Sequence, residues 1–289
     1  MLVDDYIEYQ NKYEKLYGKN TVVLMEVGSF FELYSIDKEG EDSIIKKITE
    51  LLNIQMTKKN KSDEDISIHN PLMAGVPSGA INKYLSLLLN NNYTIVLIEQ
   101  VTPPPKPERK VTRILSPGTN FEFNQNESTF LCSIYLESMK DYKSNIDLIS
   151  GGISSIDLTT GKNTVYEVHS LASDKDLCRE EMFRFIQTYN PREIVINLSN
   201  IEISKDDIIN FFELNDKVVH INYKIDSNYI KLSYQNEILK KIFQGHGLLT
   251  PIEYLDLEKY PFGLISYISL LNFAYEHDET IITKIEKPD

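Results

Sequence analysis

Two short apolar runs separated by a glycine turn constrain the fold of this chain more than any other feature. TVVLMEV predicts a buried strand, Gly28 begins a turn, and FFELYSI predicts a second extended segment. Successive residues of a strand point to opposite faces, so Phe30 and Glu32 are expected on one face and Phe31 and Leu33 on the other. One of the two adjacent aromatic rings is therefore expected to be exposed.

Strand and helix patterns alternate after this hairpin. Residues 42–52 and 80–92 carry apolar side chains at helical spacing, whereas YTIVLIEQV and RKVTRIL predict strands. Alternation of this kind is typical of an α/β layer. We therefore predict an N-terminal α/β domain with a mixed sheet over residues 1–120.

The second part of the chain predicts another α/β domain. FLCSIYLE, LISGGISSIDLTT and TVYEVHS predict three strands, and PREIVIN predicts a fourth. A helix is expected between them over residues 173–190, with Ser173 as its N-cap. The polar stretch at 121–130 predicts a linker, and the second domain is expected over residues 131–279. The charged tail, residues 280–289, is expected to be the unpacked start of a further domain.

Composition narrows the class of protein. The 289 residues are 42% hydrophobic, which suits two ordinary domain cores, and the net charge of −13 argues against a generally basic nucleic-acid binder. The charge is uneven, because residues 1–120 hold 16 acidic and 14 basic residues and the remainder holds 27 and 16. Two cysteines are too few for a disulfide framework, and no segment resembles a signal peptide or a membrane span. An intracellular protein with no membrane partner is expected.

No complete catalytic apparatus is visible in the sequence. It contains no G-x-x-x-x-G-K-[ST] loop, no H-E-x-x-H motif, no Cys/His spacing suited to zinc and no G-x-S-x-G turn. We therefore predict that this chain is not an enzyme and holds no cofactor or metal. One alternative is a metal-dependent nuclease of RNase H type in the second domain, for which Asp157 is the candidate carboxylate, although such chemistry needs several carboxylates around the metals.

Three motifs, in order, resemble a known family. VLMEVGSFFELY, NPLMAGVPSGAINKYLSLLLNNNYTIVLIEQV and PERKVTRILSPGT are similar to the mismatch-recognition domain of the MutS DNA mismatch repair proteins. FLCSIYLES, GGISSIDLTTG and FIQTYNPREIVI are similar to the family's connector domain, which has an RNase H-like fold without nuclease chemistry. The resemblance implies the first two domains of a longer protein, whose lever, clamp and ATPase domains, with ATP and Mg²⁺, are missing.

The resemblance also implies a site. Phe30 matches the intercalating phenylalanine of the family and Glu32 the glutamate of its F-x-E motif, with Gly28 and Phe31 in support. An apolar wedge of this kind unstacks a base step from the minor groove, and Glu32 would then form a hydrogen bond to the displaced base. An alternative reading, a protein-interaction scaffold with no role at DNA, predicts instead that Phe30 is buried.

Affinity for DNA would come from phosphate contacts. The candidates are two basic clusters of the first domain: Lys106, Arg109, Lys110 and Arg113, and Lys58, Lys59 and Lys61. A few such contacts predict weak, salt-sensitive binding by this chain alone. The implied partners are double-stranded DNA with mispairs or small loops, a second MutS-type subunit and a MutL-like protein, which would locate the protein at DNA.

Overall fold

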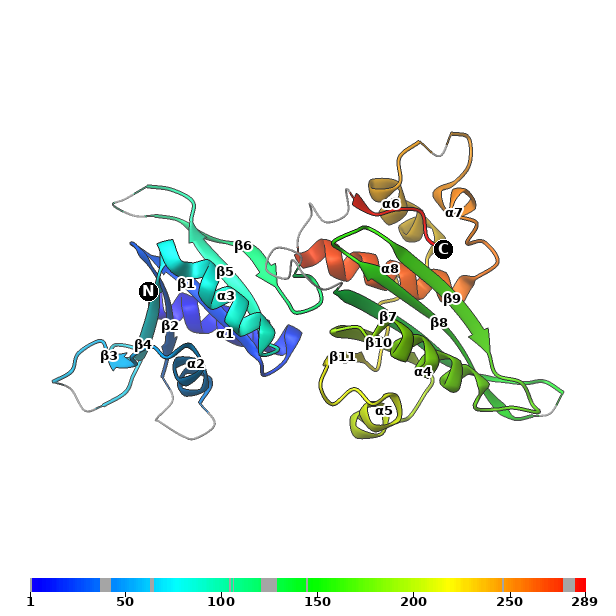
Figure 1. Cartoon of the computed structure of the whole chain (residues 1–289), viewed down its shortest axis with the longest axis horizontal. Coiled ribbons are helices and arrows are strands. Elements are labelled where there is room, and N and C mark those ends of the chain that lie inside the picture. Colours follow the sequence, from blue (N-terminus) through cyan, green and yellow to red (C-terminus); the bar gives the residue numbers. More distant parts are fainter. Residues whose placement is uncertain are drawn as a thin grey trace. The chain divides into compact units, whose positions relative to one another are not determined.

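The chain divides into two compact units, Met1–Pro117 and Gly118–Asp289 (Figure 1). The boundary falls at Pro117 rather than at residue 120, and residues 121–128 of the predicted linker lie outside the described part of the chain. The computed structural model describes residues 2–36, 43–62, 65–103, 105, 107–120, 129–143, 145–245, 247–277 and 284–289.

The first domain is built on a six-stranded sheet in the order β3-β4-β2-β1-β5-β6. Strands β1 and β5 are parallel and the other neighbours are antiparallel, which confirms the mixed α/β sheet. Its elements are α1 (Leu2–Tyr17), β1 (Thr21–Val27), β2 (Phe30–Ser35), α2 (Ile44–Leu52), β3 (Thr57–Lys58), β4 (Leu72–Pro77), a 3₁₀ turn η1 (Ser78–Ala80), α3 (Ile81–Asn90), β5 (Thr94–Gln100) and β6 (Arg109–Leu115).

Helix α1 is an element that the sequence pattern did not predict. It packs on β1 and β2, where the Tyr6 hydroxyl donates to the Val23 carbonyl oxygen at 3.0 Å. The Gln10 amide bonds the Thr21 carbonyl oxygen at 2.8 Å and the Val23 N–H at 2.9 Å. Hydrogen bonds to strand backbone therefore fix α1 against the middle of the sheet, while α2 and α3 pack against β2, β4 and β5.

The second domain has a five-stranded sheet in the order β11-β10-β7-β8-β9. Strands β7, β8 and β9 are antiparallel, and β10 and β11 run parallel to β7, in agreement with the predicted RNase H-like arrangement. The elements are β7 (Phe130–Lys140), β8 (Asp147–Asp157), β9 (Asn163–His169), α4 (Leu177–Tyr189), β10 (Glu193–Ser199), α5 (Lys205–Phe212), β11 (Val218–Asn222), α6 (Leu232–Ile242), α7 (Pro251–Tyr254) and α8 (Pro261–His277).

Helix α8 lies deep in this domain. It packs on β7, β8 and β9, and most of its residues are buried. Its close approach requires Gly152 on β8, since a Cβ there would lie 2.1 Å from the Phe262 carbonyl oxygen. None of the helices in the described ranges combines the length and apolar character that a bilayer crossing needs.

Two local expectations for the second domain are wrong. Helix α4 begins at Leu177 instead of near Ser173, because Asp174 Oδ1 accepts the N–H groups of Asp176 and Leu177 and holds the preceding residues in a turn. The tail residues 284–289 are packed, since the Val165 N–H donates to the Asp289 carbonyl oxygen at 2.9 Å, alongside strand β9.

Candidate functional site

The hairpin of β1 and β2 presents an aromatic ring and a carboxylate on one face. The Phe30 side chain is 45% exposed and Glu32 is half-buried, whereas Phe31 is 4% exposed and Leu33 is buried. The predicted alternation is therefore confirmed. The exposure of Phe30 contradicts the prediction of the interaction-scaffold alternative.

A two-residue turn sets the start of β2. Val27 pairs with Phe30, and Gly28 between them has φ +63°, a conformation that L side chains rarely adopt. A Cβ at Gly28 would meet no atom within 4 Å, so its backbone conformation, and not crowding, favours glycine. Gly28 thus aligns the first residue of β2 with the end of β1.

Tyr34 is a site residue that the sequence reasoning missed. It lies on β2 two residues after Glu32, and its hydroxyl donates a hydrogen bond to Glu32 Oε2. The Tyr34 ring is buried and meets the Tyr6 ring of α1 edge to face, with centroids 5.2 Å apart. Burial, followed by the hydrogen bond and the negative charge of Glu32, raises the pKa of Tyr34, so the phenol stays protonated and acts as the donor.

Gly75 supports Glu32 from the neighbouring strand. It pairs directly with Glu32 across β2 and β4. A Cβ at Gly75 would lie 3.3 Å from Glu32 Cγ and 3.2 Å from the Phe31 carbonyl oxygen. Because contacts this short force the neighbour to shift, the absent side chain leaves space for the stem of Glu32. The glycine in PLMAGVPSG is the signal in the sequence.

A hollow of about 300 Å³ opens beside this pair. Its walls are mostly apolar, and Glu32 and Tyr34 contribute the polar atoms from β2. The loop after β3 adds two further polar side chains, Lys59 and His69. The full lining is Leu2, Val3, Val27, Glu32, Tyr34, Lys59, Ile68, His69 and Met73. Lys59, one of the predicted phosphate contacts, thus reaches the neighbourhood of Glu32, on an exposed loop position.

The first basic cluster is divided between the two faces of the sheet. Arg109 pairs with Gln100 of β5, and the register through β5 and β1 brings Arg109 to the face that carries Glu32. Its Nε donates to the Glu26 carbonyl oxygen at 2.8 Å. Glu26 lies on β1 beside Val27, the residue that pairs with Phe30, so the Arg109 side chain reaches across β5 and its guanidinium lies next to the hairpin of β1 and β2.

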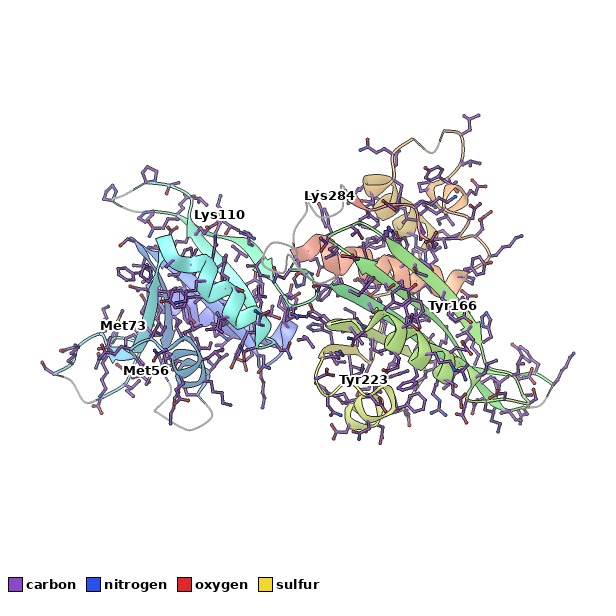
Figure 2. All side chains as sticks on the ribbon, in the orientation of Figure 1. Met56, Met73, Lys110, Tyr166, Tyr223 and Lys284 are labelled. Atoms are coloured by element: carbon purple, nitrogen blue, oxygen red, sulfur yellow. The ribbon has the colours of Figure 1, made fainter. Side chains whose placement is uncertain are left out.

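The other members of that cluster point elsewhere. The β5–β6 register shifts after Leu97, so that Arg113 pairs with Leu97 while Val111 pairs with Ile98. Lys110, which Figure 2 labels on β6, alternates with Arg109 and points to the opposite face, as does Arg113.

The remaining predicted phosphate contacts have different outcomes. Lys106 lies outside the described residues. Lys58 is half-buried in the short strand β3, and Lys61 is exposed in the loop that follows.

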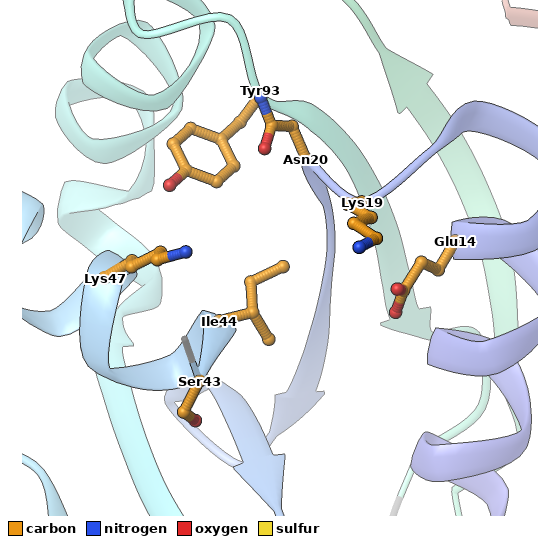
Figure 3. A pocket seen from close by; sticks show the side chains of 7 residues that line it. All are labelled: Glu14, Lys19, Asn20, Ser43, Ile44, Lys47 and Tyr93. Carbon is orange, nitrogen blue, oxygen red and sulfur yellow. The ribbon is translucent and has the colours of Figure 1, made fainter. Parts of the chain in front are cut away.

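A second hollow, of about 450 Å³, lies at the other end of β1 (Figure 3). Asn20 and Tyr93, which precede β1 and β5, line it together with the ammonium groups of Lys19 and Lys47. Phe30 follows the opposite end of β1, a strand length of roughly 20 Å away. This hollow is therefore separate from the site at the hairpin.

The nuclease alternative depended on Asp157, at the end of β8. Its carboxylate accepts the Thr159 N–H at 2.9 Å and the Thr160 hydroxyl at 3.0 Å, so it stabilises its own turn. Within the described ranges, no three His, Cys, Asp or Glu side chains gather closely enough to hold a metal ion.

The part of the chain that carries the hairpin motif matches a known protein family. The family model for MutS domain I matches residues 6–124. A mutS-homologue DNA mismatch repair protein of Acanthamoeba polyphaga mimivirus is 29% identical to this chain and aligns with 98% of it. The DNA mismatch repair protein MutS of Caldanaerobacter subterraneus is 27% identical over 99% of the chain, and that of Clostridioides difficile 26% over 98%. The first domain therefore matches domain I of the MutS family, and the whole chain aligns with MutS proteins.

The chain spans only part of these MutS relatives. It covers 27% of the mimivirus protein, 29% of the Caldanaerobacter protein and 26% of the Clostridioides protein. A family B DNA polymerase structure from Pyrobaculum calidifontis matches 86% of this chain and 40% of its own, with a TM-score of 0.28 and 11% identity, values that do not indicate a shared fold.

The MutS motif residues of the hairpin all lie inside the matched region, residues 6–124. A loop that would hold the phosphates of ATP, G-x-x-x-x-G-K-[ST], does not occur in the 289-residue sequence.

Proposed function

We propose that this chain acts in DNA mismatch repair by binding mismatched or looped double-stranded DNA. Phe30 enters the minor groove at a mispaired step and Glu32 forms a hydrogen bond to the displaced base. The observation that carries this proposal is that the exposed Phe30 ring lies on the same face of β2 as Glu32, whereas the adjacent Phe31 is buried. An exposed aromatic ring followed by a hydrogen-bonding group is suited to opening a base step and contacting the base.

Discrimination would come from the energy of deforming the duplex. Unstacking a base step costs on the order of a few kcal/mol, and the cost is least where pairing is already faulty. A well-paired duplex resists the kink, so Phe30 inserts preferentially at a mispair. The carboxylate of Glu32 adds to this selectivity, since an anion near the phosphates is unfavourable unless a base compensates it.

Phosphate contacts would supply most of the affinity. Arg109 shares the face of Glu32, and Lys59 lines the hollow beside it, so these two cations are the best placed of the candidates. Two contacts give weak binding whose affinity falls steeply with salt.

The wider protein would supply what this chain lacks. We propose that ATP and Mg²⁺ bind outside these 289 residues, and that the second domain relays the nucleotide state as a connector. A second MutS-type subunit would close around the DNA, and a MutL-like protein is a further partner of the whole protein. In the second domain, Asp157 is engaged in hydrogen bonds within its own turn, which favours this connector role over nuclease chemistry.

Phe30→Ala tests the proposal. Binding of two duplexes that differ only by one G·T mispair would be compared by fluorescence anisotropy at low ionic strength, where phosphate contacts are strongest. The affinity ratio of mispaired to paired duplex is expected to fall to about one, because the wedge is lost.

The matched control is Phe211→Ala on α5, which removes a ring that is 39% exposed in the second domain. It should leave the ratio unchanged. The proposal would be contradicted if Phe30→Ala kept the wild-type affinity ratio of mispaired to paired duplex. It would also be contradicted if the two variants lowered this ratio equally.

A further inference from the structure

We propose that Tyr34 is a positioning residue that determines mispair specificity by holding Glu32. The Tyr34 hydroxyl donates to Glu32 Oε2, which leaves Oε1 to accept a hydrogen bond from the displaced base. This inference rests on the proposed function, and it assigns the orientation of the carboxylate to a residue outside the F-x-E motif.

Only one oxygen of the carboxylate is engaged by the protein. Among the described residues, Glu32 accepts a hydrogen bond from Tyr34 at Oε2, and no described donor bonds Oε1. A glutamate side chain has three rotatable bonds, and fixing them at the moment of binding costs conformational entropy. A tyrosine that fixes them in the free protein lowers that cost, which strengthens the contact with the base.

The tyrosine itself is held by the packing of α1. Its ring is buried against the Tyr6 ring, edge to face, and the Tyr6 hydroxyl is bonded to the Val23 carbonyl oxygen on β1. Tyr6 and Tyr34 therefore connect the first helix to the carboxylate of Glu32. Gly75, which pairs with Glu32 from strand β4, leaves space for the stem of Glu32.

The second domain contains a matched pair. The Tyr135 hydroxyl donates to Glu137 Oε2 at 2.7 Å, across the same two-residue spacing on β7. The Tyr135 ring is buried and stacks on Phe262, with centroids 5.7 Å apart. Tyr135→Phe thus removes the same kind of hydrogen bond at a position with no role in the proposed DNA site.

The experiment compares Tyr34→Phe with Tyr135→Phe in the 289-residue chain, by the same pair of duplexes at low ionic strength. Both substitutions keep the ring and remove only the hydroxyl, and thermal unfolding of each variant checks that it folds. In Tyr34→Phe the affinity for the mispaired duplex should fall about threefold to tenfold with little change for the paired duplex. In Tyr135→Phe the ratio should stay at the wild-type value.

A double-mutant cycle separates positioning from a general structural effect. In a Glu32→Ala background, Tyr34→Phe should change the affinity ratio no further, because the hydroxyl acts only through the carboxylate. The inference is overturned if Glu32→Ala lowers the ratio and Tyr34→Phe does not, or if Tyr34→Phe lowers it equally in both backgrounds.

Failure of the proposed function has a different result. If Phe30→Ala and Glu32→Ala both keep the wild-type ratio, or if the wild-type chain does not prefer the mispair, the mismatch-binding role itself is wrong and the role of Tyr34 falls with it. If those two variants lower the ratio and Tyr34→Phe keeps it, only the inference about Tyr34 is wrong.

Discussion

Strands β2 and β7 carry the same local arrangement, a tyrosine hydroxyl bonded to a glutamate two residues away, in different surroundings. On β2 the pair of Tyr34 and Glu32 borders a hollow and follows an exposed phenylalanine. On β7, Tyr135 is covered by Phe262 of helix α8. The hydrogen bond alone therefore does not mark a site.

The two strands differ in the burial of the residues around the tyrosine–glutamate pair. Every residue from 131 to 136 of β7 is buried, so both faces of that strand are covered. Strand β2 begins with an exposed residue, and the buried positions alternate with accessible ones until Leu33. One face of β2 is open at the start of the strand, so the Glu32 carboxylate can contact a bound base. In the β7 pair, by contrast, Tyr135 is part of the core.

The largest expected effect separates neighbouring residues on β2. Phe31→Ala should lower the free energy of unfolding by about 3–5 kcal/mol, because it leaves a cavity, whereas Phe30→Ala should change it by about 0.5 kcal/mol or less. On β7 the neighbours Ile134 and Tyr135 are both buried, so alanine at either position should cost several kcal/mol, on the order of a core truncation. Urea denaturation measures all four variants. Equal losses from Phe30→Ala and Phe31→Ala would remove the distinction between the strands.

A titratable histidine distinguishes the interiors of the two domains. His277, at the end of α8, is buried among Glu193, His220 and Phe273. Burial lowers the pKa of His277 to about 4, while the attraction of Glu193 opposes that shift. The folded domain therefore keeps the imidazole neutral at a pH at which the unfolded chain binds a proton.

The stabilising contribution of neutral His277 is complete above pH 6.5, the pKa that applies to the unfolded chain, and is lost as the pH falls towards 4. The loss is on the order of 3 kcal/mol across this window. Unfolding of the second domain, followed by urea titration at several pH values, should show it, and His277→Gln should flatten the dependence. His69→Gln, at an exposed position of the first domain, is the control and should leave it unchanged.

The smallest expected effect concerns the space around Glu32. Gly75→Ala places a Cβ 3.3 Å from Glu32 Cγ, so the side chain must shift, at a cost of about 1 kcal/mol in stability. The affinity ratio of mispaired to paired duplex should fall about twofold to threefold, since the carboxylate is displaced from the base. Gly79→Ala is the matched control, because a Cβ there meets no atom within 4 Å. Equal ratios in the two variants would show that Glu32 tolerates the shift.

Local patterns were enough to predict the β1–β2 hairpin and the exposure of Phe30, since strand alternation and a glycine turn depend on near neighbours in sequence. Helix α1 escaped prediction because its buried face consists largely of tyrosines and Gln10, which bond to strand backbone and give no apolar stripe. The packing of the Tyr34 ring against Tyr6 of that helix was therefore missed as well.

The division of the basic cluster could not be read from sequence either. A register shift between β5 and β6 skips one residue, and this decides the face on which Arg113 lies. Bulges of this kind follow from strand pairing, which the spacing of lysines and arginines does not reveal.

Kinking of mispaired DNA by Phe30 is the central claim, and energy transfer between dyes at the two ends of a short duplex measures it most directly. Binding of the wild-type chain should shorten the end-to-end distance of a G·T duplex, by a kink of roughly 20–90°, and leave the paired duplex straight. Phe30→Ala, at protein concentrations that saturate the DNA, should leave both duplexes straight. A G·T duplex that stays straight with the wild-type chain, or that kinks equally with Phe30→Ala, would contradict the account.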